Sequence, residues 1–435
     1  MKIVLIGAGS SSFGRGQIAD IVQAEEFRSR GVTLTLVDLN EPNLKAMEGL
    51  ARRMVEHVGA DIVIDSTTDR CEALPGADYV ITAVARHRME LWEQDFRVPL
   101  CYGFRQCLGE NGGPGALFHA LRSFELILPI CADMERLCRE ALLLNFTNPE
   151  ARVLHAVSHL TRVKAVGICH GVSMGIDYIA KLLNRPADSL EVTAAGVNHF
   201  YAVAKVIDKE NGKDVLSECK QRVLSGGAAG WHRLFKKLLE VFDVFTFPSD
   251  DHIGEYLSFG TEYWGVKWIY GQEHRKVGGP TDLSAWMVTP DEIQSFADGT
   301  KPIDDRALCP SGEHAVPIIA DIELDRGRRH PSVNVLNKEG FIENVPRTGA
   351  VEVPAVVDAK GIHPEHVGNI PEPFASFLRT QYAIHDTLTE AYRTRSKRLL
   401  LQALLLDPVV NSIDGAERLL DDMLELQGDY LPDFG

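Results

Sequence analysis

The chain has 435 residues, of which 45% are hydrophobic and 24% are charged, and its formal net charge is −16. This length suits two domains, and the composition is that of an ordered globular protein. The acidic balance argues against nucleic acid and anionic membranes as partners, because binding them requires clustered basic residues.

The start of the chain and its cysteines bear on its location. The apolar run of residues 2–6 stops at Gly7 and a Gly/Ser loop follows, unlike a signal peptide, and no run approaches 18 apolar residues. The eight cysteines are scattered, with no Cys-x-x-Cys pair. We therefore expect a cytoplasmic protein with reduced thiols and no membrane segment. All cysteines except Cys169 are interpreted as core or surface residues.

The first 185 residues alternate between apolar runs and helix-compatible stretches. This alternation predicts a doubly wound parallel sheet, that is, a Rossmann-type α/β domain over residues 1–185. Between the last of these runs, helices are predicted notably at 115–139 and 150–160. The predicted strands are 2–6, 34–37, 62–64, 79–84, 142–145 and 163–168.

After residue 185 the pattern changes. Residues 190–208 alternate as an antiparallel strand pair does, which places a second, α+β domain at 186–435. Residues 300–375 hold many prolines and little periodicity, and we expect a long loop-rich region there. The chain should close with amphipathic helices at 373–406, with a break, and at 413–427.

The first candidate site is Gly7-Ala8-Gly9-Ser10, directly after the first strand. Glycines there allow a tight turn and leave room for a pyrophosphate at a helix N-terminus. Asp38, at the end of the second strand, suits the ribose hydroxyls of NAD and would repel the extra phosphate of NADP. The third glycine of the usual fingerprint is replaced by Ser12. The alternative is a purely structural strand-to-helix turn.

Two further groups follow predicted strands. Asn145-Phe146-Thr147-Asn148-Pro149 could place amides in the ligand crevice, although Asn-Pro turn chemistry explains the same residues. Cys169-His170 is followed thirty residues later by His199. A thiolate and an imidazole suit a divalent transition ion with open positions for substrate oxygens. A core cysteine and a hydrogen-bonded histidine are the alternative.

A polar cluster begins at Ser249-Asp250-Asp251-His252 and continues to Glu255 and Tyr256. Adjacent carboxylates beside a histidine could supply a general base with a shifted pKa. The same run also suits a helix N-cap with acidic residues in the first turn.

Taken together, these motifs resemble the NAD- and metal-dependent glycosidases of glycoside hydrolase family 4. The resemblance extends over nearly the whole chain. Besides the groups above it includes the segment 95–122 with Gly-Gly-Pro-Gly at 112–115, Val351-Glu352-Val353-Pro354, and Asp407-Pro408. It implies a fold like that of lactate and malate dehydrogenases, and a cytoplasmic homo-oligomer, dimer or tetramer.

The resemblance also implies a mechanism. NAD⁺ oxidises C3 of the sugar, a base removes the C2 proton, the group on C1 is eliminated, water adds, and the hydride returns. Cys169 and His199 would hold a divalent metal, Mn²⁺ (manganese). Asn148 would bind substrate hydroxyls, and His170 would bind substrate or assist the leaving group. Asp250 matches the family's base, with Asp251 left open.

The residues after Cys169 bear on the substrate. Family members acting on 6-phosphosugars typically show Cys-Asn or Cys-Asp followed two residues later by proline, whereas this chain has Cys169-His170-Gly171-Val172. Cys-His-Ser is associated with α-galactosidases and Cys-His-Gly with α-glucuronidases. The resemblance thus favours an α-glycoside of an unphosphorylated sugar, a uronide among the candidates, with α-galactosidase and α-glucosidase as alternatives. The loop 106–111 departs from the family's Gln-Glu-Thr pattern, and Glu110 could replace the missing acid.

Two rivals remain at this point. A lactate/malate-type dehydrogenase shares the predicted fold, and it would accumulate NADH where a glycosidase recycles it. An NAD-binding sensor without catalysis would need no metal at Cys169 and His199.

Overall fold

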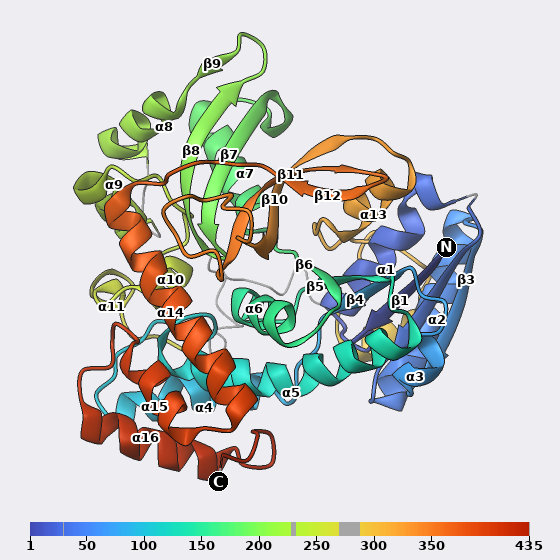
Figure 1. Ribbon diagram of the computed structural model, residues 1–435. Helices are drawn as coiled ribbons and strands as arrows, with labels where there is room; N and C mark the ends of the chain where they lie inside the picture. The colour runs from blue at the N-terminus through green and yellow to red at the C-terminus, as the bar shows by residue number, and fades with distance from the viewer. Residues whose placement is uncertain (29, 228–231, 269–287, 435) are drawn as a thin grey trace.

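The computed structural model describes residues 1–28, 30–227, 232–268 and 288–434. In this part of the chain one mixed sheet of twelve strands runs through the molecule, in the order β3-β2-β1-β4-β5-β6-β10-β11-β7-β8-β9, with β12 beside β11 (Figure 1). The strands are β1 (Lys2–Ile6), β2 (Val32–Val37), β3 (Ile62–Thr67), β4 (Tyr79–Thr82), β5 (Leu142–Asn145), β6 (Lys164–Gly167), β7 (Leu190–Val197), β8 (Phe200–Asp208), β9 (Lys213–Asp214), β10 (Arg328–Leu336), β11 (Ala350–Asp358) and β12 (Gly361–Pro364).

The first six strands are parallel and confirm the predicted Rossmann-type fold. Their order, 3-2-1-4-5-6, is that of a doubly wound dinucleotide-binding sheet. The helices of this half are α1 (Phe13–Gln23), α2 (Glu41–Val58), α3 (Arg70–Ala73), α4 (Arg88–Cys101), α5 (Gly113–Leu137), α6 (Glu150–Leu160) and α7 (Gly171–Leu183).

Strand β1 shows how the sheet is buried on both faces. Ile3 and Leu5 pack in a core with residues of α1 and α2, whereas Val4 and Ile6 pack in a second core with residues of α5 and α6. Alternate residues of a strand point to opposite faces, so an uninterrupted apolar run is what a strand covered on both sides requires.

The second half continues the same sheet with antiparallel strands. β7 and β8 form the predicted antiparallel pair. β10 joins the parallel strands by pairing Asn334 with Gly167 of β6, and β11 pairs with β10 and β7. The predicted domain boundary at residue 185 falls in the short connection from α7 to β7 and stays a prediction.

The expectation of a loop-rich region at 300–375 is wrong. This stretch contains the nine-residue strands β10 and β11, which lie inside the sheet. Their prolines, Pro331 and Pro354, fall where the register shifts between His330 and Val333. A proline cannot donate a ladder hydrogen bond, but a bulge tolerates it. The prolines therefore made two interior strands look like loops in the sequence.

The remaining helices pack on both halves of the sheet, with α12 against α2 and α15 against α5, for example, and they close the chain. They are α8 (Leu216–Arg222), α9 (Arg233–Phe242), α10 (Asp250–Ile253), α11 (Gly260–Tyr263), α12 (Pro290–Ala297), α13 (Ala315–Glu323), α14 (Glu372–Thr394), α15 (Lys397–Leu405) and α16 (Ile413–Leu426). The predicted break in the helical stretch 373–406 is confirmed at Arg395, whose φ is 54°. Helix α14 crosses the molecule beside α6 (Figure 1).

Helix α5 is long and apolar enough to cross a membrane by length and composition alone. However, 72% of its most apolar window is buried inside the protein. It contributes Leu117, Phe118 and Leu121 to the core on one face of the parallel sheet, which accounts for its apolar character.

Candidate active site

Those predicted site residues that follow parallel strands lie at the carboxyl edge of the sheet. Gly7 follows β1, Asp38 follows β2, and Cys169 lies two residues beyond β6. Parallel strands end at the same edge, and in a doubly wound sheet this edge forms the ligand crevice. The fold therefore assembles on one edge residues that are far apart in sequence.

The glycine turn after β1 is tightly packed. A Cβ atom on Gly7, whose φ is +95°, would lie 2.2 Å from the carbonyl oxygen of Ala83. A Cβ on Gly9 would lie 2.8 Å from Oδ2 of Asp38, which accepts a hydrogen bond from the Gly9 amide at 2.9 Å. Only glycine fits both positions without displacing backbone or the Asp38 carboxylate.

The role of the missing third glycine falls to Gly14. A Cβ there would lie 2.3 Å from the carbonyl oxygen of Ala8, so α1 can approach the turn only because residue 14 has no side chain. Ser12 is the N-cap residue of α1, and Ser10 Oγ accepts a hydrogen bond from the Phe13 amide at 3.2 Å. The turn, the helix N-terminus and Asp38 have the arrangement of a dinucleotide site.

Cys169 and His199 meet at the junction of the two halves. The Sγ atom lies 3.3 Å from Nε2 of His199, and the Gly171 amide points at the same sulfur from 3.4 Å. Burial raises the pKa of the Cys169 thiol and lowers the pKa of the His199 imidazole. A half-buried cysteine and a buried histidine at this separation can both face one cation, which would also favour the thiolate.

The backbone positions His199 through an uncommon conformation. Val197 pairs with Phe200, so Asn198 and His199 form a two-residue hairpin turn between β7 and β8. The φ angle of His199 is 67°, in the left-handed region that residues other than glycine rarely adopt. Such conformations cluster at functional positions.

Asn148 lies beside the strand end of β5, next to the atypical loop 106–111. Its Nδ2 donates to Oε1 of Glu110 at 3.3 Å, and its main-chain oxygen accepts from Ser123 Oγ at 2.7 Å. Asn145 has a structural role instead, since its Oδ1 accepts from Thr82 Oγ1 and from the Thr147 amide. The two amides that the sequence could not separate therefore have different surroundings.

His170 pairs with a residue that the sequence did not indicate. Its Nδ1 lies 2.6 Å from Oε1 of Glu313, which is almost fully buried. The hydrogen bond with Glu313 raises the pKa of His170. Glu313 lies 143 residues away, just before α13 and within the region expected to be loops, and no spacing signal could have revealed it.

The two aspartates of the polar cluster differ in their contacts. Asp250 accepts hydrogen bonds from the amides of Leu234 and Phe235 at 2.8 and 2.9 Å, so its carboxylate caps helix α9. Burial raises its pKa to about 6, against these hydrogen bonds. Asp250 therefore caps a helix, as one of the two interpretations of this cluster expects. The helix that it caps is α9, and not the helix α10 that begins at Asp250.

Asp251 instead forms a pair with His252. Its Oδ1 lies 2.8 Å from Nδ1 of His252 and accepts from Ser249 Oγ. Although burial lowers the pKa of His252, Asp251 raises it to about 9. The His252 ring lies 4.7 Å from the ring of His199, so the pair adjoins the proposed metal ligands.

Glu255 holds the atypical loop in place. Its carboxylate accepts hydrogen bonds from the amides of Glu110 and Asn111, at 2.6 and 3.1 Å. Glu110 and Glu255 are both buried, and burial together with the Glu110 charge raises the pKa of Glu255 to about 8. The loop that departs from the family pattern is therefore fixed by a buried carboxyl group.

The Rossmann-type sheet, the glycine turn and the Cys169–His199 pair together define an enzyme of the dinucleotide-binding α/β class. The family described as Family 4 glycosyl hydrolase matches residues 2–185, and its C-terminal domain matches residues 194–410. The chain belongs to family 4 of the glycosyl hydrolases, and it is a glycosidase.

Relatives across this family share the full length of the chain. An alpha-glucosidase of Erwinia rhapontici is 33% identical, covering 99% of this chain and 98% of its own. An alpha-galactosidase of Rhizobium meliloti is 30% identical, covering 100% and 89%. A probable 6-phospho-beta-glucosidase of Bacillus subtilis is 31% identical, covering 100% and 98%.

Solved structures have the same fold. A 6-phospho-alpha-glucosidase from gut microorganisms, in complex with NAD and glucose-6-phosphate, superposes with a TM-score of 0.85 at 22% identity, covering 100% of this chain and 99% of its own. The 6-phospho-beta glucosidase of Thermotoga maritima, with manganese, NAD+ and glucose-6-phosphate, gives a TM-score of 0.81 at 23% identity and 99% coverage of both chains.

Proposed function

We propose that this glycosidase hydrolyses α-glycosides of unphosphorylated sugars with NAD⁺ and a divalent metal ion as cofactors. The observation that carries the proposal is the Cys169–His199 pair, which lies on the same sheet edge as the glycine turn and Asp38. A dehydrogenase needs the turn alone, whereas a redox-dependent elimination needs a metal beside the cofactor.

The glycine turn fits NAD⁺. Gly7 and Gly9 keep side chains out of the turn that leads to the N-terminus of α1, where a pyrophosphate would lie, and Asp38 offers a carboxylate to the ribose hydroxyls. The same carboxylate would repel the 2′-phosphate of NADP. The structural neighbour from gut microorganisms was solved with NAD, which supports this cofactor.

The donor set of Cys169 and His199 fits a divalent transition ion. One sulfur and one nitrogen leave most coordination positions open for sugar oxygens. We propose Mn²⁺, the ion present in the Thermotoga maritima neighbour. When bound, NAD⁺ supplies a reversible hydride acceptor and the metal ion stabilises negative charge on substrate oxygens.

The chain's own residues then bind the sugar and move its protons. Asn148 and Glu110 present an amide and a carboxylate to the sugar hydroxyls. Asp250, whose pKa burial raises to about 6, removes the C2 proton, whereas the pair with His252 lowers the pKa of Asp251 and makes it the weaker base. His170, oriented by Glu313, contacts the departing glycosidic oxygen. These roles would complete an elimination and water addition without net redox.

The substrate is proposed to be uncharged. The carboxylates of the proposed sugar site are offset by positive partners, since Glu313 pairs with His170, Asp251 with His252 and Glu110 with Arg88. The alpha-glucosidase and alpha-galactosidase relatives, at 33% and 30% identity, support a neutral α-hexoside. An α-glucoside or α-galactoside therefore ranks above the uronide that the Cys-His-Gly motif suggests.

A substrate panel tests the proposal. Purified enzyme is assayed with NAD⁺, Mn²⁺ and a reductant against p-nitrophenyl α-glucoside, α-galactoside, α-glucuronide, α-galacturonide and α-glucoside 6-phosphate. We expect the highest kcat/KM on a neutral α-hexoside, dependent on both cofactors and without accumulating NADH. A highest kcat/KM on the 6-phosphate or on a uronide would contradict the substrate assignment, and stoichiometric NADH would contradict the reaction.

Location and assembly are proposed on the family resemblance. We propose a cytoplasmic homo-oligomer, either a dimer or a tetramer. Size-exclusion chromatography with light scattering measures the assembly, and a monomer at micromolar concentration would contradict it.

A further inference from the structure

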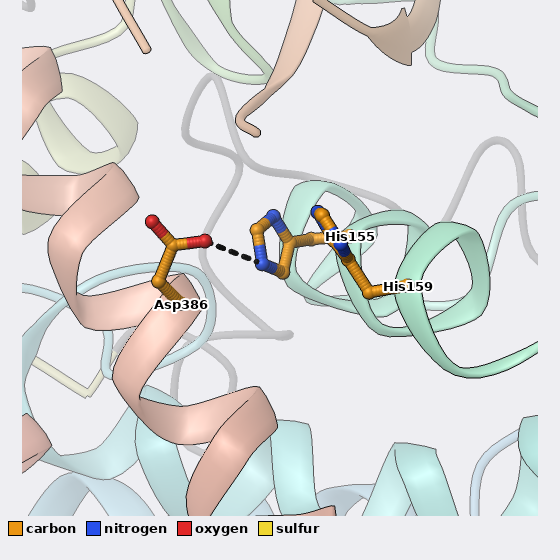
Figure 2. A group of neighbouring side chains, drawn as sticks. All are labelled: His155, His159 and Asp386. Atoms are coloured by element: carbon orange, nitrogen blue, oxygen red, sulfur yellow. Dashed lines mark ion pairs between the residues drawn. The ribbon is translucent and has the colours of Figure 1, made fainter. Parts of the chain in front are cut away.

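A second group of potential metal ligands lies between helices α6 and α14. His155 and His159 come from α6, one turn apart, and Asp386 comes from α14. One ligand atom of each lies within 4.8 Å of the others. Figure 2 shows the Asp386 carboxylate facing His155, with His159 further along the same helix.

The contacts of the group leave ligand atoms available. His155 Nε2 lies 3.2 Å from Oδ1 of Asp386, and the His155 side chain is only 1% exposed. His159 Nε2 lies 2.9 Å from the carbonyl oxygen of Thr348. A carbonyl only accepts, so Nε2 of His159 carries the hydrogen and Nδ1 keeps its lone pair.

Thr348 also orients the carboxylate. Its Oγ1 donates to Oδ2 of Asp386 at 3.1 Å, which leaves Oδ1 directed at His155. Metal-binding histidines and carboxylates are commonly held by hydrogen bonds of this kind from outside the ligand set. The chain segment before β11 thus supports ligands from both helices.

We propose that His155, His159 and Asp386 bind a second divalent transition ion, of the zinc type, that links α6 to α14. Two imidazoles and one carboxylate match the protein ligands of zinc sites in which a fourth position is open to water. The Asp386 side chain is 45% exposed, so solvent reaches the open position. Tetrahedral ligands at about 2.1 Å lie about 3.4 Å apart, and Nε2 of His155 and Oδ1 of Asp386 already lie at a similar separation, 3.2 Å.

This group is distinct from the proposed catalytic metal pair. It shares no residue with Cys169 and His199, and it contains no sulfur ligand. Its place is structural, because α6 begins directly after Asn148-Pro149 and packs against α14. An ion there would stabilise the helix that follows the Asn148 strand end.

Metal stoichiometry tests the proposal. Full-length protein freed of metal is titrated with Co²⁺, and bound metal is counted by elemental analysis and followed by absorption. We expect two equivalents in the wild type, one in His159→Gln and one in Asp386→Asn. Only the site containing Cys169 should show a sulfur-to-cobalt charge-transfer band, so His159→Gln should retain this band. Binding by these two variants equal to the wild type would overturn the proposal.

Two matched variants complete the experiment. His363→Gln removes an exposed histidine that pairs with Asp358. No third ligand accompanies this pair in the described part of the chain, so the variant should bind as much metal as the wild type does. Cys169→Ser should lose the sulfur band but keep one equivalent. If Cys169→Ser binds as the wild type does while His159→Gln loses an equivalent, the catalytic assignment fails and the α6–α14 site stands.

Thermal unfolding gives an independent measure. With Zn²⁺ at about 100 times its Kd, the Tm of Cys169→Ser should rise by about 3 °C. The double variant Cys169→Ser with His159→Gln should show no such rise, while its Tm without metal should match that of the Cys169→Ser parent, since His159 is exposed. An equal rise in both proteins would overturn the proposal.

Discussion

The sulfur of Cys169 lies 3.3 Å from the Nε2 atom of His199, although thirty residues separate them in sequence. Cys169 follows the last parallel strand, and His199 lies in the first hairpin turn of the antiparallel half. The junction of the two halves therefore creates the one contact on which the proposed metal chemistry depends.

Removing either member of this pair should abolish metal-dependent hydrolysis. Cys169→Ser and His199→Ala should each lower kcat/KM at least about 100-fold, because either change leaves the ion without half of its protein ligands. The double variant should lower kcat/KM little further than either single variant does, since both residues would act through a single ion. Cys101→Ser, at an exposed cysteine, is the control. Additive losses would contradict a shared ion.

Asp38 should determine the choice between NAD⁺ and NADP⁺. Asp38→Asn keeps an acceptor for the Gly9 amide but removes the charge that faces the ribose. The ratio of kcat/KM with NAD⁺ to that with NADP⁺ should fall by about 10–100-fold, the value of one hydrogen bond to a charged group. An unchanged ratio would mean that Asp38 only supports the turn.

Glu255 should make stability depend on pH. Its pKa is raised from 4.5 to about 8 in the folded protein, by burial and by Glu110. The native state therefore binds more protons than the unfolded state between these values, and stability falls as pH rises through this window. Glu255→Gln should remove up to about 1 kcal/mol per pH unit of this slope.

Chemical denaturation between pH 5 and 9 measures the difference between the wild type and Glu255→Gln. Glu56→Gln, at an exposed position on α2, provides the comparison and should follow the wild type. Parallel pH profiles for the wild type and Glu255→Gln would show that Glu255 is already ionised at pH 5.

Gly171 should control the sugar without affecting the fold. A Cβ atom there would meet Cys169 Sγ and His199 Cδ2 at 3.7 Å, which is ordinary contact. Gly171→Ser should therefore fold normally. Because the change creates the Cys-His-Ser motif associated with α-galactosidases, it should raise the ratio of kcat/KM on an α-galactoside to kcat/KM on an α-glucoside. By contrast, a Cβ on Gly175 would lie 2.3 Å from Tyr201 Oη, so Gly175→Ser should lower the Tm. An unchanged sugar preference in Gly171→Ser would show that residue 171 does not determine substrate specificity.

The parallel half of the fold is predictable from sequence because its strands are buried on both faces. Continuous apolar runs such as 2–6 mark such strands directly, and short crossovers fix their order. Strands β10 and β11 are not predictable in this way, because Pro331 and Pro354 interrupt them at a bulge. A proline in a strand usually argues against an interior position, and only the pairing with neighbouring strands shows that β10 and β11 lie inside the sheet.

The site is predictable where its residues follow strands. Gly9, Asp38 and Cys169 fall at strand ends, so the topology alone places them on one edge. The contact of His170 with Glu313 depends on tertiary structure across 143 residues and leaves no local pattern. The same holds for the different contacts of Asp250 and Asp251, adjacent residues that the sequence cannot distinguish.

Deuterium incorporation at C2 of the released sugar tests the central claim most directly. The enzyme with NAD⁺ and Mn²⁺ hydrolyses its preferred α-glycoside in D₂O, and the product is analysed by NMR. Removal of the C2 proton by the site's base and reprotonation from solvent should place deuterium at C2, with no net NADH formed. A product with hydrogen at C2 would contradict elimination and indicate direct hydrolysis.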